Sequence, residues 1–163
     1  MSQDPLLSGF DHYAPKIASL NSLERTFLNP KDFGGRVRAL SFEVNTGLSA
    51  SGGVTNADVV AVGLLPAGAR PLLLTLSHED LGADQVISVG TYTLDGTAID
   101  DGNDLAEDLD VAAAGTKNTV LSGEVGSDTG AMVAVGLEFE HSGTTNPADD
   151  KDVSGVLLYV VNS

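Results

Sequence analysis

Short apolar runs separated by turn residues fill most of the chain, and the stretch 59–94 shows this pattern most clearly. It contains three runs, at 59–65, 70–79 and 85–94. The turn 66–69 (PAGA) separates the first two, and proline and glycine reverse a chain at little steric cost. The third run is rich in β-branched and aromatic residues, which suit a half-buried pleated surface. We therefore expect three consecutive strands in this stretch.

The remaining apolar runs predict further strands. From Val37 onward, Leu40, Phe42 and Val44 alternate with smaller or polar residues, which is the pattern of a strand with one buried face. Pro71 stands at the beginning of the run 70–79, where a strand tolerates proline better than inside a central ladder. The other expected strands cover residues 109–113, 118–122, 132–140 and 153–161.

These runs amount to about eight strands with no convincing long helix between them. The spacing leaves no room for regular βαβ alternation, so a parallel sheet is not expected. We predict an all-β fold: a two-sheet antiparallel β-sandwich, jelly-roll-like, with an N-terminal extended arm. An immunoglobulin-like sandwich is the second topology, although the cysteines and tryptophan typical of immunoglobulin domains are absent.

The first 36 residues differ from the rest, because their apolar side chains are scattered singly and three of the six prolines lie among them. Apolar residues at three- and four-residue spacing allow one or two helical turns within 18–27. Such an arm would be poorly solvated if free, so it packs either on its own domain or against a neighbouring subunit or larger assembly. We divide the chain into an arm, 1–36, and a β-sandwich domain, 37–163.

The charge is large and unevenly distributed. The net charge is −15; residues 1–38 carry +1 and the remaining residues carry −16. A surface this acidic argues against nucleic acid as a partner, since phosphate binding needs clustered cations. The distribution indicates either an acidic, solvated surface throughout or a near-neutral leader that contacts a partner while an acidic body faces solvent.

Composition excludes several kinds of site. There is no cysteine, so neither a disulfide framework nor a thiolate metal site can form. We find no signal-peptide pattern and no apolar stretch long enough to cross a membrane, and we expect no membrane partner. Three tyrosines, five phenylalanines and no tryptophan predict a core built mainly of aliphatic side chains.

Acidic loops are the candidates for a metal site. Residues 95–110 contain seven acids, and carboxylates on a loop can bind Ca²⁺, but the EF-hand spacing is absent. Residues 149–152 (DDKD) are a weaker candidate. His12, His78 and His141 lie far apart and form no helical zinc motif. A solvated acidic loop is the simpler interpretation, and we predict no metal ligand and no cofactor.

No catalytic motif stands out. Ser77, His78 and Glu79 are the residue types of a hydrolytic relay, but neighbours on a strand point to opposite faces of the sheet. The sequence contains neither a nucleophile elbow nor a phosphate-binding glycine loop. We predict that the protein is not an enzyme.

Three short motifs carry a resemblance to a known class of proteins. They are 64–70 (LLPAGAR), 81–84 (LGAD) and 86–90 (VISVG), within about 30 residues of sequence. In this order they resemble small virion structural proteins of tailed bacteriophages. The resemblance implies a decoration (cement) protein that binds the outside of the capsid, contacts the major capsid protein and forms a homotrimer. It further implies a location on the virion exterior after synthesis in the host cytoplasm.

Under this resemblance the arm makes the contacts between subunits and with the capsid. The expected partner-binding residues combine apolar and cationic side chains: Phe10, Tyr13, Lys16, Ile17, Leu20, Arg25, Phe27, Lys31, Arg36 and Arg38. The alternative function is a carbohydrate-binding β-sandwich module, on a phage tail or fibre or in a secreted protein. Such modules stack sugars on exposed aromatic rings, and Tyr13, Tyr92 and Tyr159 are a small supply.

Overall fold

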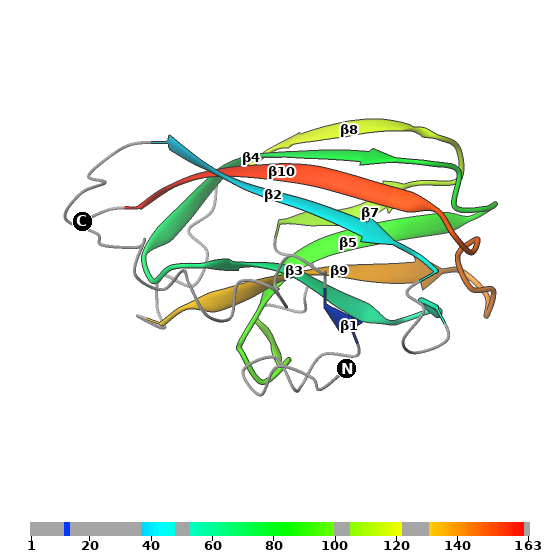
Figure 1. The fold of residues 1–163 in the computed structure, drawn as a ribbon, viewed down its shortest axis with the longest axis horizontal. Helices are drawn as coiled ribbons and strands as arrows, with labels where there is room; N and C mark the ends of the chain where they lie inside the picture. Colours follow the sequence, from blue (N-terminus) through cyan, green and yellow to red (C-terminus); the bar gives the residue numbers. More distant parts are fainter. Residues whose placement is uncertain (1–11, 14–36, 48–52, 100–104, 122–130, 162–163) are drawn as a thin grey trace.

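The apolar runs form the strands of two β-sheets that pack face to face in a computed structural model (Figure 1). The structure describes residues 12–13, 37–47, 53–99, 105–121 and 131–161. Its strands are β1 (His12–Tyr13), β2 (Val37–Asn45), β3 (Val59–Leu65), β4 (Ala69–His78), β5 (Gln85–Tyr92), β6 (Ala98–Ile99), β7 (Ala106–Asp110), β8 (Gly115–Val120), β9 (Val133–His141) and β10 (Asp152–Val161). These residues include no helix that could span a membrane.

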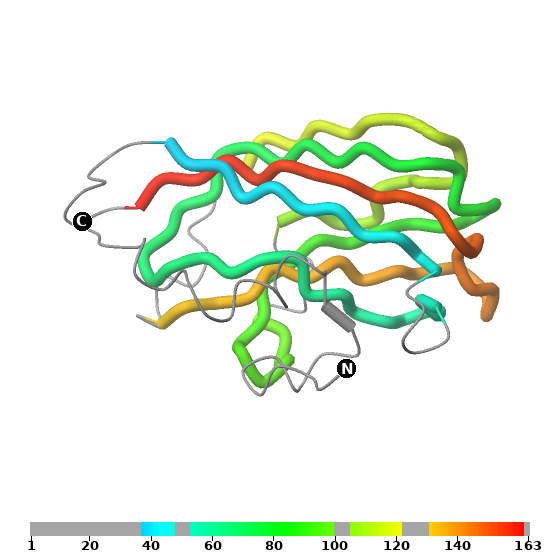
Figure 2. Tube along the Cα trace, viewed as in Figure 1, coloured from blue at the N-terminus to red at the C-terminus, as the bar shows by residue number. Residues whose placement is uncertain are grey.

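The order of the strands is that of a jelly roll. One sheet runs β1-β3-β9-β5-β6, with β7 also paired to β5, and the other runs β2-β10-β4-β8. The chain changes sheet at each step from β2 to β5 and again from β7 to β10, which gives the two interleaved layers of this fold. Figure 2 shows the cyan trace of β2 beside the red trace of β10, its antiparallel partner. The predicted jelly-roll sandwich is confirmed; β1, which pairs with β3 in parallel, is an addition to it.

Aliphatic side chains from the facing surfaces of the two sheets fill the core, as their alternation in the sequence predicts. Phe139, Leu65, Leu74, Leu76 and Leu137 are among the largest side chains that are fully buried. The core continues beyond the strands into loop residues that close one end of the sandwich, such as Leu81 and Val111, both 0% exposed. Burial of this apolar surface is the main stabilising contribution to such a fold.

The strand boundaries agree with the predictions to within one or two residues, except at β7 and β8. Both lie about three residues earlier than predicted, because Asp110 ends β7: its carboxylate accepts a hydrogen bond from the backbone N–H of Ala112 at 2.9 Å. The alanines that follow, 112–114, form the turn into β8 instead of a strand. Alanine contributes little to a pleated surface, so the local turn decides the boundary.

Pro71 lies inside a strand that is central in its sheet, with β10 on one side and β8 on the other. The register explains how the ladder accommodates it. Strand β8 pairs only with Leu73–His78, so the edge of β4 at Pro71 has no β8 neighbour, and the β10 register shifts between Leu158 and Tyr159 at the same point. The proline thus lies next to a bulge at Leu72, where a missing N–H is tolerated.

Little of the predicted arm falls within the described residues. His12 and Tyr13 pair with Val60 and Ala61 of β3, so this part of the arm lies against its own domain. The rest of the arm before β2, including the helical turns predicted for 18–27, lies outside the described residues.

Candidate functional site

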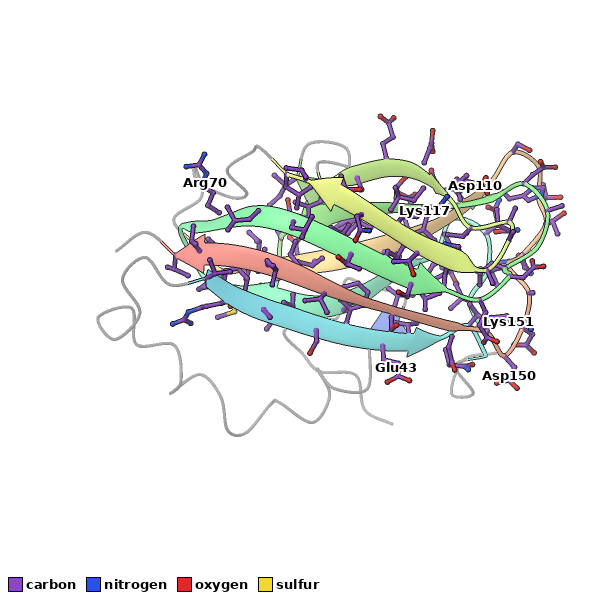
Figure 3. The ribbon with its side chains drawn as sticks, turned by 90° about the horizontal axis from the view of Figure 1, so that it is seen from above. Glu43, Arg70, Asp110, Lys117, Asp150 and Lys151 are labelled. Atoms are coloured by element: carbon purple, nitrogen blue, oxygen red, sulfur yellow. The ribbon has the colours of Figure 1, made fainter. Side chains whose placement is uncertain are left out.

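The middle of the outer surface of the β2-β10-β4-β8 sheet carries almost no charge (Figure 3). The register places its outward side chains in rows across the strands, of which four form the surface described here and a fifth, Asn45 with Asp152, borders them at one end. The four rows are Val37 with Val160 and Arg70; Ala39 with Leu158, Leu73 and Val120; Ser41 with Val156, Thr75 and Asn118; and Glu43 with Ser154, Ser77 and Thr116. We call these residues the neutral face. Arg70 and Glu43 are its charged members, and Figure 3 shows them at opposite ends of the sheet.

One half of the neutral face is apolar and open to solvent. Val120 is 83% exposed, Val37 58% and Val156 36%, and Leu158 and Leu73 between them are partly buried. An antiparallel sheet that faces water usually alternates apolar residues inside with polar residues outside. A contiguous apolar surface across four strands is instead typical of a contact surface.

The other half is polar, and four of its side chains already bond to one another in two pairs. The Thr75 hydroxyl donates to the Asn118 side-chain carbonyl at 2.8 Å, and the Ser77 and Thr116 hydroxyls lie 3.1 Å apart. A polar group that keeps its hydrogen bond loses little when a partner excludes water from it. These four side chains can therefore be covered at a low desolvation cost, whereas covering Glu43 at the end of this half would be costly.

The outer surface of the other sheet is built differently. Small residues form its floor, and the Tyr92 ring lies directly over Gly136, where a Cβ would come within 2.5 Å of the ring. Tyr92, Ala61 and Ala134 form a second buried apolar cluster, with Leu64 packed against it. This surface is thus already occupied near Tyr92 and offers no open apolar area there.

Two glutamates share the polar end of that surface. The Ser88 hydroxyl donates to a Glu140 carboxylate oxygen at 2.9 Å, and the backbone N–H of Asp108 donates to the same hydroxyl at 3.2 Å. Glu138 stands two residues before Glu140 and therefore on the same face of β9. Burial, and then the negative charge of Glu140, raise the pKa of Glu138 above its usual value.

Many of the acidic residues act as turn caps instead of ligands. The carboxylates of Asp58, Asp80, Asp95, Asp110 and Asp149 each accept a hydrogen bond from a nearby backbone N–H. Bonds from the Thr93 hydroxyl and the Thr97 backbone lower the pKa of Asp95. Within the described part of the chain, no three histidine or acidic side chains come together in a group that could hold a metal ion.

Ser77, His78 and His141 make contacts that stabilise the fold. The Ser77 hydroxyl points to the neutral face, whereas His78 is buried at 6% exposure and its Nδ1 lies 3.0 Å from the Glu79 carbonyl oxygen. The two side chains thus lie on opposite sides of the sheet, as the sequence predicts. His141 uses its Nδ1 to accept a bond from the Gly143 N–H at 2.7 Å.

Few of the predicted partner-binding residues can be located. Phe10, Lys16, Ile17, Leu20, Arg25, Phe27, Lys31 and Arg36 lie outside the described residues. Tyr13 is placed in β1 by its backbone. Arg38 is partly buried in β2 and alternates with the residues of the neutral face. The described residues therefore do not test the predicted set, which stays a prediction.

Sequence reasoning missed the neutral face, although β10 carried a signal for it. In that strand Val156, Leu158 and Val160 are apolar on one side while Leu157 and Tyr159 are apolar on the other. A strand that is apolar on both sides indicates that both surfaces of its sheet are covered. Recognising the face further required the neighbours Ala39, Leu73 and Val120, which only the register brings together.

The described tyrosine side chains give no platform for sugars. Tyr92 is 3% exposed and Tyr159 is 6% exposed, so neither ring can stack on a ligand from solvent. Within the described residues, the carbohydrate-binding alternative therefore lacks the exposed tyrosine rings on which it depended.

Three solved structures share this arrangement of strands. A chain in the capsid of Ralstonia phage GP4 superimposes with a TM-score of 0.59 at 22% identity, over 81% of this chain and 88% of that one. A chain in the capsid asymmetric unit of cyanophage Pam1 superimposes with a TM-score of 0.57 at 25% identity, over 79% of this chain and 87% of that one. This protein is similar to chains of phage capsids. A third chain, from the acidic stable capsid of Helicobacter pylori bacteriophage KHP30, superimposes with a TM-score of 0.53 at 19% identity, over 80% of this chain and 91% of that one.

The similarity extends over about four-fifths of this chain and even more of each matched chain, so it concerns the whole jelly roll. No protein-family model and no curated protein matches the sequence. The resemblance to structural proteins of phage virions is thus confirmed by the solved structures, which agree with a structural role in the virion.

Proposed function

We propose that this protein is a decoration protein that binds the outside of a phage capsid as a homotrimer and stabilises the shell. The observation that carries the proposal is the match of nearly the whole jelly roll to chains found in three phage capsid structures. In this role the protein has no catalytic activity and needs no cofactor. Its contacts are with the major capsid protein and with other copies of itself.

The charge supports a position on the exterior. Residues beyond 38 carry a net charge of −16, which would be repelled by packaged nucleic acid inside a shell. On the outside, the same charge keeps particles apart and hinders their aggregation. The cations of the first 38 residues would meet acidic patches on neighbouring subunits.

The arm supplies the contacts with the shell in this proposal. Deletion of residues 2–30 should abolish binding to capsid shells and leave the sandwich folded, because β2 and all later strands remain. The assay mixes full-length or truncated protein with shells assembled without it and measures the protein that sediments with the shells. Circular dichroism of the truncated protein is the control for folding.

Stabilisation is measured on the same particles. Shells with bound protein should disassemble at a higher temperature than bare shells, because a ligand of the assembled state stabilises that state. Full binding by the truncated protein would contradict the role of the arm. Failure of the full-length protein to bind any shell would contradict the decoration function itself.

A further inference from the structure

We infer that the neutral face is a contact surface between copies of this chain. The inference deepens the proposed function and rests on it only for the presence of several copies on one shell. The neutral face of one copy packs against the same face of a second copy, a twofold contact that is separate from the threefold contacts of the proposed trimer. It concerns a part of the molecule different from the arm, namely the open side of the β2-β10-β4-β8 sheet.

Charge is the first reason that the partner is a second copy. Two bodies with a net charge of −16 each repel one another wherever acids face acids. The neutral face is a surface where this repulsion is weak, since its only acid, Glu43, stands in the last of the four rows, next to Asp152 of the bordering row, and the other three rows contain no acid. An acidic chain that used this sheet for a basic partner would instead be expected to present its acids there.

The composition of the face is the second reason. Val37, Leu158, Val120 and Val156 are aliphatic, and interfaces between identical subunits are more apolar than those of transient complexes. In the polar half, the Thr75 hydroxyl bonds to Asn118 and the Ser77 hydroxyl to Thr116 within the sheet. Neither the aliphatic side chains nor these bonded pairs require a polar partner with matching groups.

The area is the third reason. Four strands at about 4.8 Å spacing and four rows at about 6.8 Å give a surface of about 19 Å by about 27 Å. Each copy thus offers about 500 Å², and two copies together bury about 1,000 Å², the lower bound for a specific interface. The arm would add to this area in the assembled protein.

The test places one negative charge in the middle of the face. Val156→Glu introduces the charge at a partly exposed position on the outer side of β10. Ala39→Glu is a second variant, at an exposed position of β2. Thr144→Glu is the matched control, because it adds the same charge to an exposed loop away from the face. Light scattering measures the mass of each full-length protein over a range of concentrations, and circular dichroism verifies the fold.

The wild type and Thr144→Glu should form the same oligomer. Val156→Glu and Ala39→Glu should weaken it by about a hundredfold or more, because like charges would meet in a surface that excludes water. A monomeric wild type, or folded face variants that keep the wild-type mass, would overturn the inference.

Binding to shells, measured on the same proteins, separates this inference from the proposed function. If the face variants keep their mass but no longer bind shells, the face contacts the shell and the inference is wrong while the proposed function survives. If the face variants dissociate and the wild type binds no shell, the contact between copies stands and the decoration function fails.

Discussion

Gly155→Ala tests how closely the jelly-roll core is packed against its own backbone. Gly155 of β10 lies directly opposite Phe42 of β2, and the Phe42 ring is 2% exposed. A Cβ at position 155 would lie 2.8 Å from Cε1 of the ring and closer still to Cζ. Atoms of a real core do not approach so closely, so either the ring or the strand would have to move.

The size of the effect follows from the surroundings of the ring. Phe42 belongs to the main buried cluster, so other core side chains surround the ring. Forcing one additional methyl group into a packed core costs about 1–3 kcal/mol. We expect the upper part of this range, about 2–3 kcal/mol, which corresponds to a melting temperature lower by about 4–12 °C for a chain of this size.

The assay is urea unfolding followed by circular dichroism, with thermal unfolding as a second measurement. Ser154→Ala is the control, because it changes the adjacent residue on the outer side of the same strand and should alter stability by less than about 0.5 kcal/mol. The slope of the free energy of unfolding against urea concentration should not change. A constant slope would indicate that the denatured and native states keep their compactness.

A double variant identifies the cause. Phe42→Leu alone should cost about 1–2 kcal/mol by leaving space above Gly155. Combined with Gly155→Ala, the new methyl group fills part of that space, so the combined cost should be smaller than the sum by at least about 1 kcal/mol. Simple additivity of the two costs, or a Gly155→Ala variant as stable as the wild type, would refute the proposed contact.

Two further substitutions test single interactions. Thr46→Val removes a buried hydroxyl that donates to the Ala148 carbonyl at 2.6 Å and accepts from the Lys151 N–H at 2.9 Å, so it should cost about 1–3 kcal/mol in urea unfolding; an unchanged stability would show that these bonds do not hold the two loops together. Glu138→Gln should raise stability at pH 7 by less than about 1 kcal/mol, because the pKa of Glu138 is raised in the folded state and ionisation of this partly exposed group opposes folding. The gain should disappear as the pH falls below the ordinary glutamate pKa of about 4.3, where both states hold the proton, and a gain that persists there would contradict an electrostatic cause.

Much of the fold could be predicted from local pattern. The run 59–65 became β3 without change of boundary, and the alternation of Phe42 and Val44 correctly gave the buried side of β2. These predictions succeed because a strand with one buried side must repeat its apolar residues with a period of two. The boundaries of β7 and β8 were wrong because a single carboxylate, that of Asp110, fixes a turn that the apolar pattern does not reveal.

The candidate site could not be predicted in the same way. The sequence directed attention to the arm and to the acidic loops, where cations, apolar residues and carboxylates are dense. Three of those acids, Asp95, Asp110 and Asp149, proved to be caps of turns, as Asp95 is for the turn between β5 and β6. The neutral face, by contrast, is assembled from four strands that are far apart along the chain.

By itself, the sequence determined an all-β chain with an aliphatic core, an acidic body and a near-neutral beginning. Those properties depend on composition and on the spacing of neighbours, which are local. Only the tertiary structure decided which strands lie side by side and therefore that Ala39, Leu158, Leu73 and Val120 form one row. Pairing in a sheet depends on contacts between distant segments, and a shift of one residue would turn each of these side chains to the opposite side.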